Sequence, residues 1–175
     1  MGRADVSLSE VGRAQIERLA GALPTIDRVI SSPLQRTRDT AAALGFPVEI
    51  DERVVEVDYG VYDLLPLGDV PADVWTQWRT DFDFVPPSGE SMRAMGMRVV
   101  EFCENISDLA ATQNIVVVSH VSPIKAAVAW ALGVPDDSAW RLHVDQASIT
   151  RISIGARGPV LHSFNETGHL DGIGS

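Results

Sequence analysis

The chain has 175 residues, 45% of them hydrophobic, and a formal net charge of −10 at pH 7. This length and apolar content suffice for a buried core, so we expect residues 1–175 to form a single domain. The negative charge argues against nucleic acid and anionic membranes as partners, and no apolar run reaches the roughly 18 residues of a membrane span. The lone cysteine, Cys103, excludes an internal disulfide, and the first thirty residues lack the pattern of a signal peptide, so a cytoplasmic protein is expected.

Apolar runs typical of strands alternate with amphipathic segments of helical period along the chain, which is the pattern of an α/β domain. Ser9 is a potential cap for a helix that extends to about Leu23. The pattern then predicts a short buried strand over 26–32, a helix over 34–44 and a strand over 48–55.

The middle of the chain is less regular. Residues 56–87 contain several prolines and glycines, and we expect a functional insertion with a short helix inside. Apolar residues at spacings of three and four then predict a long helix that begins at Ser88 or Ser91. A continuous apolar strand over 115–119 follows.

The last third begins with a strand-to-helix turn. Ser122 and Pro123 suit the N-cap and first position of a helix that continues to Leu132. Two further strands, over 148–154 and 159–164, surround a glycine-containing turn. The order of elements predicts one three-layer α/β/α domain with a mostly parallel sheet.

His120 lies where a ligand is expected, because the carboxyl ends of parallel strands face the crevice in which α/β proteins bind their ligands. The free amides of the next helix attract anions. A protonated His120 would donate to a phosphate oxygen and stabilise charge that develops there. A purely structural role is the alternative, and position alone leaves both open.

Five further motifs extend this picture: SSPLQRT at 31–37, EVDYG at 56–60, PPSGES at 86–91, VSH at 118–120 and NETGHL at 165–170. In this order, they make the chain resemble the histidine phosphatase superfamily, in its phosphoglycerate-mutase-like branch, over essentially its whole length. VSPIK at 121–125 and RLHVD at 141–145 resemble the small bacterial acid phosphatases of that branch. The resemblance implies metal-free hydrolysis of a phosphomonoester through a phosphohistidine, without a cofactor, on a small phosphorylated metabolite.

The resemblance also implies roles for particular residues. Arg36 corresponds to the arginine that clamps the phosphoryl group, which suits its planar, charged fork. Glu56 corresponds to the acid that protonates the leaving oxygen, for which a raised pKa is useful. His120 corresponds to the second histidine of the phosphate pocket, and Val121 would add a backbone amide. The rings of Tyr59, Trp75 and Trp78 are potential walls of the substrate end, although core packing explains the two tryptophans at least as well.

One part of the family pattern has no counterpart here. The family's nucleophilic histidine lies on its first strand in an Arg-His-Gly turn, whereas all four histidines here lie at or beyond position 120. We therefore expect the first central strand to be missing and activity to be impaired, either because the natural protein begins upstream or because the chain is a decayed relative. Either an open slot should then separate the strands over 115–119 and 148–154, or the two strands should be drawn together in a new antiparallel pair, with residues 1–6 disordered or laid across the cleft and not forming a central strand.

Two alternatives remain. A phosphoglycerate mutase moves phosphate within one substrate, but the stretch after Glu56 is compact and favours a phosphatase. The other alternative is a catalytically inactive phosphate-binding or interaction module. Metal-dependent hydrolysis is disfavoured because no histidine and carboxylate set has ligand spacing. The sequence indicates neither the substrate nor the oligomeric state.

Overall fold

The computed structural model describes residues 2–173, without the side chain of Leu67. No helix in this part of the chain has the length and apolar character needed to cross a membrane. The helices and strands are, in chain order, α1 Glu10–Ala22, β1 Arg28–Ser31, α2 Gln35–Ala42, β2 Val48–Ile50, α3 Ala72–Thr80, α4 Met92–Ala110, β3 Ile115–Val118, α5 Val121–Leu132, β4 Ile149–Gly155 and β5 Gly158–Glu166. Short 3-10 turns are η1 Glu52–Val54, η2 Gly60–Tyr62, η3 Leu67–Asp69, η4 Asp136–Arg141 and η5 Gly168–Leu170.

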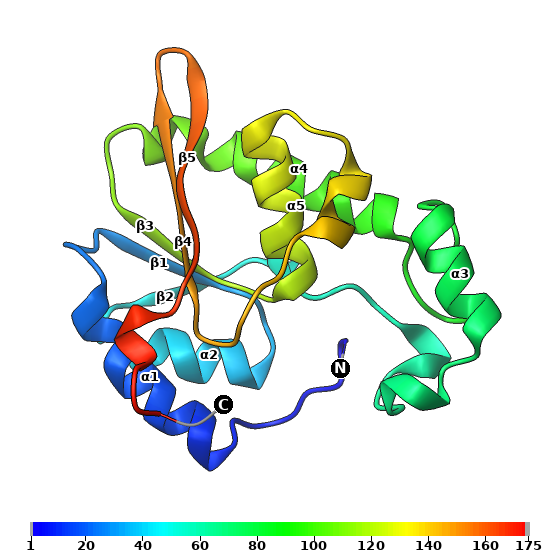
Figure 1. Ribbon diagram of the computed structural model, residues 1–175. Helices are drawn as coiled ribbons and strands as arrows, with labels where there is room; N and C mark the ends of the chain where they lie inside the picture. The colour runs from blue at the N-terminus through cyan, green and yellow to red at the C-terminus, as the bar shows by residue number, and fades with distance from the viewer. Residues whose placement is uncertain (1, 174–175) are drawn as a thin grey trace.

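Three strands form a parallel sheet in the order β2-β1-β3, while β4 and β5 form a separate antiparallel hairpin. Figure 1 shows α1 and α2 on one side of the parallel sheet and α4 and α5 on the other. This arrangement confirms the predicted layered α/β fold. Because all three parallel strands end at the same edge, the loops after β1 and β3 meet there.

The alternation of side chains along the strands divides the core in two. Val29 of β1 and Val116 of β3 belong to the cluster that α1 and α2 cover. Ile30 and Val117, one residue further along each strand, belong to the larger cluster under α4 and α5. That larger cluster also includes Trp78 of α3, so it anchors the irregular middle segment to the domain.

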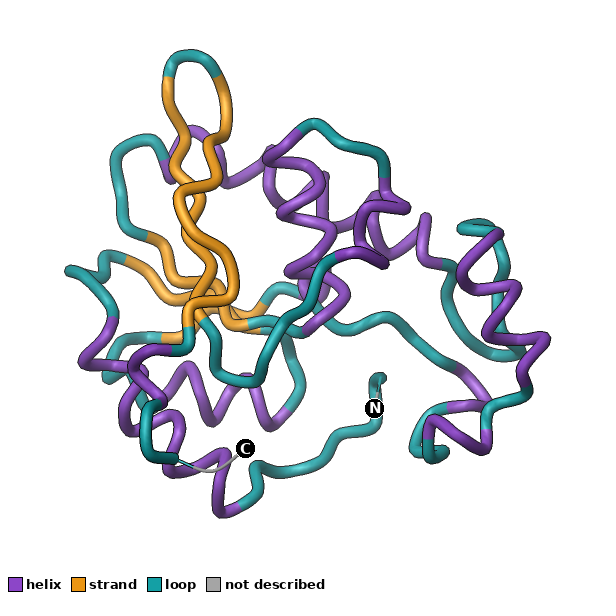
Figure 2. Tube along the Cα trace, in the orientation of Figure 1, coloured by secondary structure: helices purple, strands orange, loops and turns teal. Residues whose placement is uncertain are grey.

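The predicted gap is present in the strand pairing. Among residues 2–173, β3 pairs with β1 alone and β4 pairs with β5 alone, and residues 2–6 form no strand. The hairpin nevertheless packs beside the sheet, because Ile149 shares a cluster with Val116 and Val118 (Figure 2). Of the two predicted arrangements, the open one is therefore confirmed for the pairing of β3 and β4, while the width of the gap stays a prediction.

Several predicted helices are confirmed together with their caps. The side chain of Ser9 accepts from the amide of Gly12 at 3.1 Å, and that of Ser91 accepts from the amide of Ala94 at 3.1 Å. The short helix expected within residues 56–87 is α3. Serine is strongly preferred at a helix N-cap because its side chain accepts from a free amide of the first turn, so caps of this kind can be predicted from the sequence.

The strand predicted over 48–55 was too long. β2 ends at Ile50, and Asp51 then turns the chain into η1 by accepting from the amide of Arg53 at 2.9 Å. An Asp side chain that accepts from the backbone amide two residues later stabilises a turn, which competes with continued strand pairing. Val54 and Val55 are still buried, so the apolar pattern reflects burial without strand structure.

The start predicted for the helix after β3 was also wrong. α5 begins at Val121 with His120 at the N-cap position, so Ser122 and Pro123 lie inside its first turn. Proline is tolerated there because amides of the first turn have no intrahelical acceptor. For the same reason the amide of Ser122 is available to another group, and Glu56 accepts from it.

Candidate functional site

The residues expected to bind phosphate come together at the carboxyl edge of the parallel sheet. Arg36 lies in the first turn of α2 after β1, and His120 follows β3. The Nη2 atom of Arg36 lies 3.2 Å from Nδ1 of His120. The carboxylate of Glu56, which follows η1, lies 3.3 and 3.4 Å from the amide of Ser122 at the start of α5. Val121 supplies the first amide of that helix.

The hydrogen bonds around His120 determine its tautomer. Thr37 has a single hydroxyl proton, and it donates to a backbone carbonyl, that of Leu34 at 2.8 Å or that of Ser32 at 3.2 Å. Ser32 must therefore donate to Thr37, at 2.7 Å, which leaves the Ser32 oxygen to accept from Nε2 of His120 at 2.6 Å. Nδ1 then carries no proton and accepts from Arg36. Every partner is satisfied only when His120 is neutral.

The electrostatic environment of His120 agrees with this assignment. Burial lowers the pKa of His120 to about 3, and the positive charges of Arg36 and Arg98 act in the same direction. The expected role of a protonated donor is therefore not fulfilled in this state. A phosphate oxygen that approaches Nδ1 must bring or attract a proton to that atom.

The lowered pKa of His120 predicts a pH-dependent stability. An unfolded histidine takes up a proton below about pH 6.5, whereas His120 in the folded protein stays neutral down to about pH 3, so folding free energy is lost as the pH falls through this window. Each pH unit costs at most about 1.4 kcal/mol. In urea unfolding at pH 7.5 and pH 5.0, we expect wild type to lose about 2 kcal/mol more than His120→Asn.

Glu56 has the opposite effect on the pH dependence of stability. Its pKa is raised in the folded protein, so its contribution to the free energy of unfolding increases as the pH falls. This contribution of Glu56 is present in both wild type and His120→Asn, so it cancels when the two proteins are compared. Equal pH dependence of wild type and His120→Asn would contradict a neutral, buried His120.

Glu56 is placed to hold a proton. Its side chain is 4% exposed, and burial raises the pKa of its carboxyl, while the amides of Val57 and Ser122 and the charge of Arg36 partly oppose this. A carboxyl with a raised pKa is suited to donate a proton to a leaving oxygen. Burial likewise raises the pKa of the neighbouring Tyr59 hydroxyl to about 12.

Arg98 and Glu90 hold the backbone around Glu56. The guanidinium of Arg98 donates to the carbonyls of Val55 at 2.7 Å and Glu56 at 3.2 Å. It also forms a paired contact with the carboxylate of Glu90, at 2.9 and 2.8 Å. Sequence reasoning assigned no role to either residue, although Glu90 lies in the PPSGES motif that contributed to the resemblance.

The N-terminal segment lies against Arg36. The guanidinium donates to the carbonyls of Ala4 at 2.9 Å and Gly2 at 2.8 Å, while Asp63 accepts from the amides of the same two residues, each at 2.7 Å. A side chain at position 2 would clash, because a Cβ there would lie 2.7 Å from the Val57 carbonyl. The fork of Arg36 is thus already occupied by backbone oxygens that an anion would replace.

The remaining histidines lie away from this pocket. His143 lies in the loop before β4 and contacts Asp145 at 3.0 Å. His162 on β5 contacts Ser153 at 2.7 Å, and His169 in η5 contacts the carbonyl of Ala147 at 3.0 Å. All three belong to the C-terminal segment around the hairpin.

Comparison with known proteins places this geometry in context. The family model described as histidine phosphatase superfamily (branch 1) matches residues 1–167. A bifunctional protein of Mycobacterium tuberculosis is 34% identical over 97% of this chain and 50% of its own length, so the chain spans half of that relative. Phosphoserine phosphatase 1 of Hydrogenobacter thermophilus is 33% identical over 97% of this chain and 85% of its own length.

The solved structures include a close match to the fold. The complex of mycobacterial glucosyl-3-phosphoglycerate phosphatase with inorganic phosphate aligns with a TM-score of 0.81 and 27% identity, over 97% of this chain and 92% of its own. That protein was crystallised with phosphate, the ligand expected for the pocket described above.

Proposed function

This chain belongs to the histidine phosphatase superfamily, and on that basis we propose that its pocket binds the phosphoryl group of a small phosphomonoester. The observation that carries the proposal is the convergence of Arg36 and His120 beside the amide of Val121, which begins α5. A guanidinium fork and a helix N-terminus are both anion-binding groups. The buried Glu56 adds a proton donor at the same place.

Each group has a separate task in the proposed reaction. Arg36 donates two parallel hydrogen bonds to the phosphoryl oxygens, and the amide of Val121 donates a further one. His120 donates from Nδ1 once that atom is protonated. Glu56 gives its proton to the oxygen that leaves when the P–O bond breaks. Metal-free transfer to a histidine nitrogen and then to water is the reaction of which these groups are part.

We also propose that residues 1–175 as they stand bind the ester but do not form a phosphohistidine. No residue before position 120 is a histidine, and His120 has both ring nitrogens engaged with Ser32 and Arg36. This observation keeps the inactive phosphate-binding module as a second candidate. Nothing in the site geometry favours a mutase over a phosphatase.

Added imidazole tests whether the rest of the catalytic apparatus works. A free imidazole nitrogen can attack phosphorus in place of the absent side chain, after which water cleaves the phosphorylated imidazole. We expect imidazole to raise the hydrolysis of phenyl phosphate by the chain in a saturable manner, and Glu56→Gln to remove most of that rise, because the phenol needs a proton on leaving. If imidazole gives the same rate with and without protein, the chain is a binding module.

Several coarser expectations complete the proposal. We propose a single domain over 1–175 that resembles the small bacterial acid phosphatases, without nucleic acid or membrane partners. A cytoplasmic location is proposed from the lone Cys103, which is buried, and whose pKa is raised by that burial to about 12. Such a thiol is mostly protonated and unreactive.

A further inference from the structure

Lys125 is the only lysine among the 175 residues, and the phosphate site described above gives it no role. It lies in α5, one turn after Val121. Residues four apart on a helix share one face, about 6 Å apart along the axis, and their side chains lean toward the N-terminus of the helix. The four-carbon stem of Lys125 therefore directs its amine back toward the amide of Val121.

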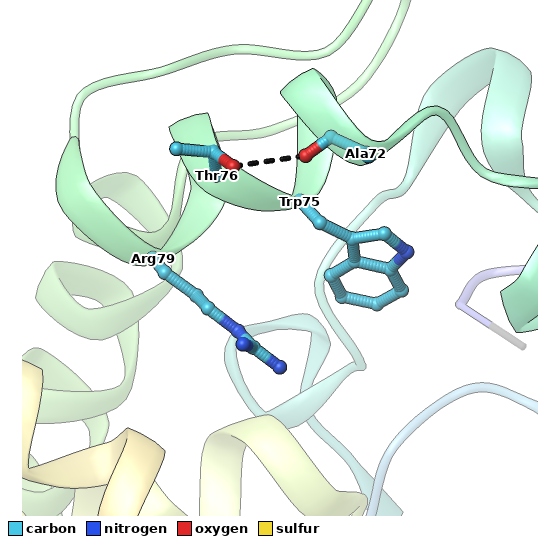
Figure 3. A pocket seen from close by; sticks show the side chains of 4 residues that line it. All are labelled: Ala72, Trp75, Thr76 and Arg79. Atoms are coloured by element: carbon cyan, nitrogen blue, oxygen red, sulfur yellow. Dashed lines mark hydrogen bonds between the residues drawn. The ribbon is translucent and has the colours of Figure 1, made fainter.

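The amine of Lys125 is unpaired in a half-buried position. Among residues 2–173 it forms no hydrogen bond and no ion pair. Burial lowers the pKa of Lys125, and the negative charge of Glu56 only partly opposes this effect. Arg79, which projects from α3 in Figure 3, shows the usual alternative, an exposed cation. A half-buried lysine amine is neutral more often than an exposed one, and the neutral amine is the nucleophilic form.

Glu56 connects Lys125 to the phosphate pocket. The carboxyl of Glu56 accepts from the amide of Ser122, which lies three residues before Lys125 and is its neighbour on the helix surface. The charge of the same carboxyl acts on both Arg36 and Lys125. A phosphoryl group held by Arg36 and the start of α5 therefore has the amine of Lys125 near it, on the side of Glu56.

The side on which Lys125 lies indicates the class of ligand that it meets. In the proposed function Glu56 faces the ester oxygen of the ligand, so Lys125 faces the atom bonded beyond that oxygen. In an alkyl phosphate this atom is a saturated carbon. In an acyl phosphate it is a carbonyl carbon, which is the electrophile that a neutral amine attacks.

We propose that Lys125 is a site of acylation by acyl phosphates that bind in the phosphate pocket. The proposal rests on the proposed function, because the pocket holds the phosphoryl group. The lone pair of Nζ forms a bond to the acyl carbon, and the bond from that carbon to the phosphate oxygen breaks. The electron pair of the broken bond and the proton lost from nitrogen both go to the phosphate. The products are an amide, which has lost the positive charge of Lys125, and hydrogen phosphate.

A second lysine in the same molecule provides the reference rate. Arg157 is exposed in the turn between β4 and β5, so Arg157→Lys adds a solvated amine at the tip of the hairpin and keeps the net charge. The variant is treated at pH 7.5 with acetyl phosphate at about 1 mM, near the expected dissociation constant. Peptide mass mapping follows the two lysines and the α-amino group separately. We expect Lys125 to be acetylated about tenfold faster than the introduced lysine, because binding holds the acyl carbon beside its amine.

Two further measurements separate reaction in the pocket from general reactivity of the amine. Saturating inorganic phosphate should slow the acetylation of Lys125 and leave the introduced lysine unaffected. In the same background, Arg36→Ala should slow the acetylation of Lys125 by acetyl phosphate. It should not slow acetylation by the N-hydroxysuccinimide ester of acetic acid, which carries no phosphate for Arg36 to hold.

The outcomes distinguish the acylation site from the phosphate site. Equal rates at the two lysines would overturn the acylation site. So would fast acetylation of Lys125 that neither phosphate nor Arg36→Ala slows. Phosphate binding, measured by phosphorus NMR on the same samples, would remain intact in both cases. An absence of saturable phosphate binding would overturn the proposed function as well.

Discussion

Replacement of Arg36 by alanine is expected to abolish the binding of inorganic phosphate. Arg36 is the only guanidinium that contacts His120 among the described residues, so its loss removes the main positive charge at the start of α5. We expect millimolar affinity for the wild type, about −4 kcal/mol. Loss of two charge-assisted hydrogen bonds lowers this by about a hundredfold or more, below detection.

The modest affinity that we expect for the wild type has a structural cause. Phosphate must displace the carbonyls of Gly2 and Ala4, which occupy the Arg36 fork in the unliganded protein. A phosphorus NMR titration measures the affinity, with Arg157→Ala as the control for loss of charge. Arg36→Lys should retain weak binding, since it keeps the charge without the fork. Unchanged binding in Arg36→Ala would show that the anion binds elsewhere.

The second large effect concerns covalent chemistry. With p-nitrophenyl phosphate, the chain of 175 residues is expected to show no burst of nitrophenol and no phosphohistidine at any pH. A phosphoryl acceptor needs a free imidazole nitrogen in the pocket, and the three other histidines lie around the C-terminal hairpin. Stopped-flow absorbance and phosphorus NMR of the quenched protein measure the two signals.

Glu56→Gln serves as the background in this experiment, because it keeps the pocket shape without the acid. A stoichiometric burst that survives His120→Ala would mean that another group accepts the phosphoryl, and the assignment of the missing nucleophile would then be wrong.

The sequence predicts the fold well where local and tertiary signals agree. Ser9 and Ser91 precede amphipathic segments and cap the helices expected there. The prediction failed where a side chain competes with regular structure, as Asp51 does after β2. It also failed at α5, because the N-cap role of His120 depends on the end of β3 and on Glu56, which is distant in sequence.

The candidate site likewise combines features that the sequence predicts with features that it does not. The meeting of Arg36 and His120 followed from the resemblance and from their positions after two parallel strands. The tautomer of His120 could not be predicted, because it depends on a chain of hydrogen bonds through Ser32 and Thr37 that forms only in the folded protein. The support of Glu56 by Arg98 joins residues 42 apart in sequence and leaves no local signal.

A crystal structure of the chain with vanadate tests the central claim most directly. We expect one oxyanion within hydrogen-bond distance of the Arg36 guanidinium, the amide of Val121 and Nδ1 of His120, with the carbonyls of Gly2 and Ala4 moved off Arg36. An anion bound only elsewhere on the protein, with the contacts of Arg36 to Gly2 and Ala4 unchanged, would contradict a phosphomonoester site at this edge of the sheet.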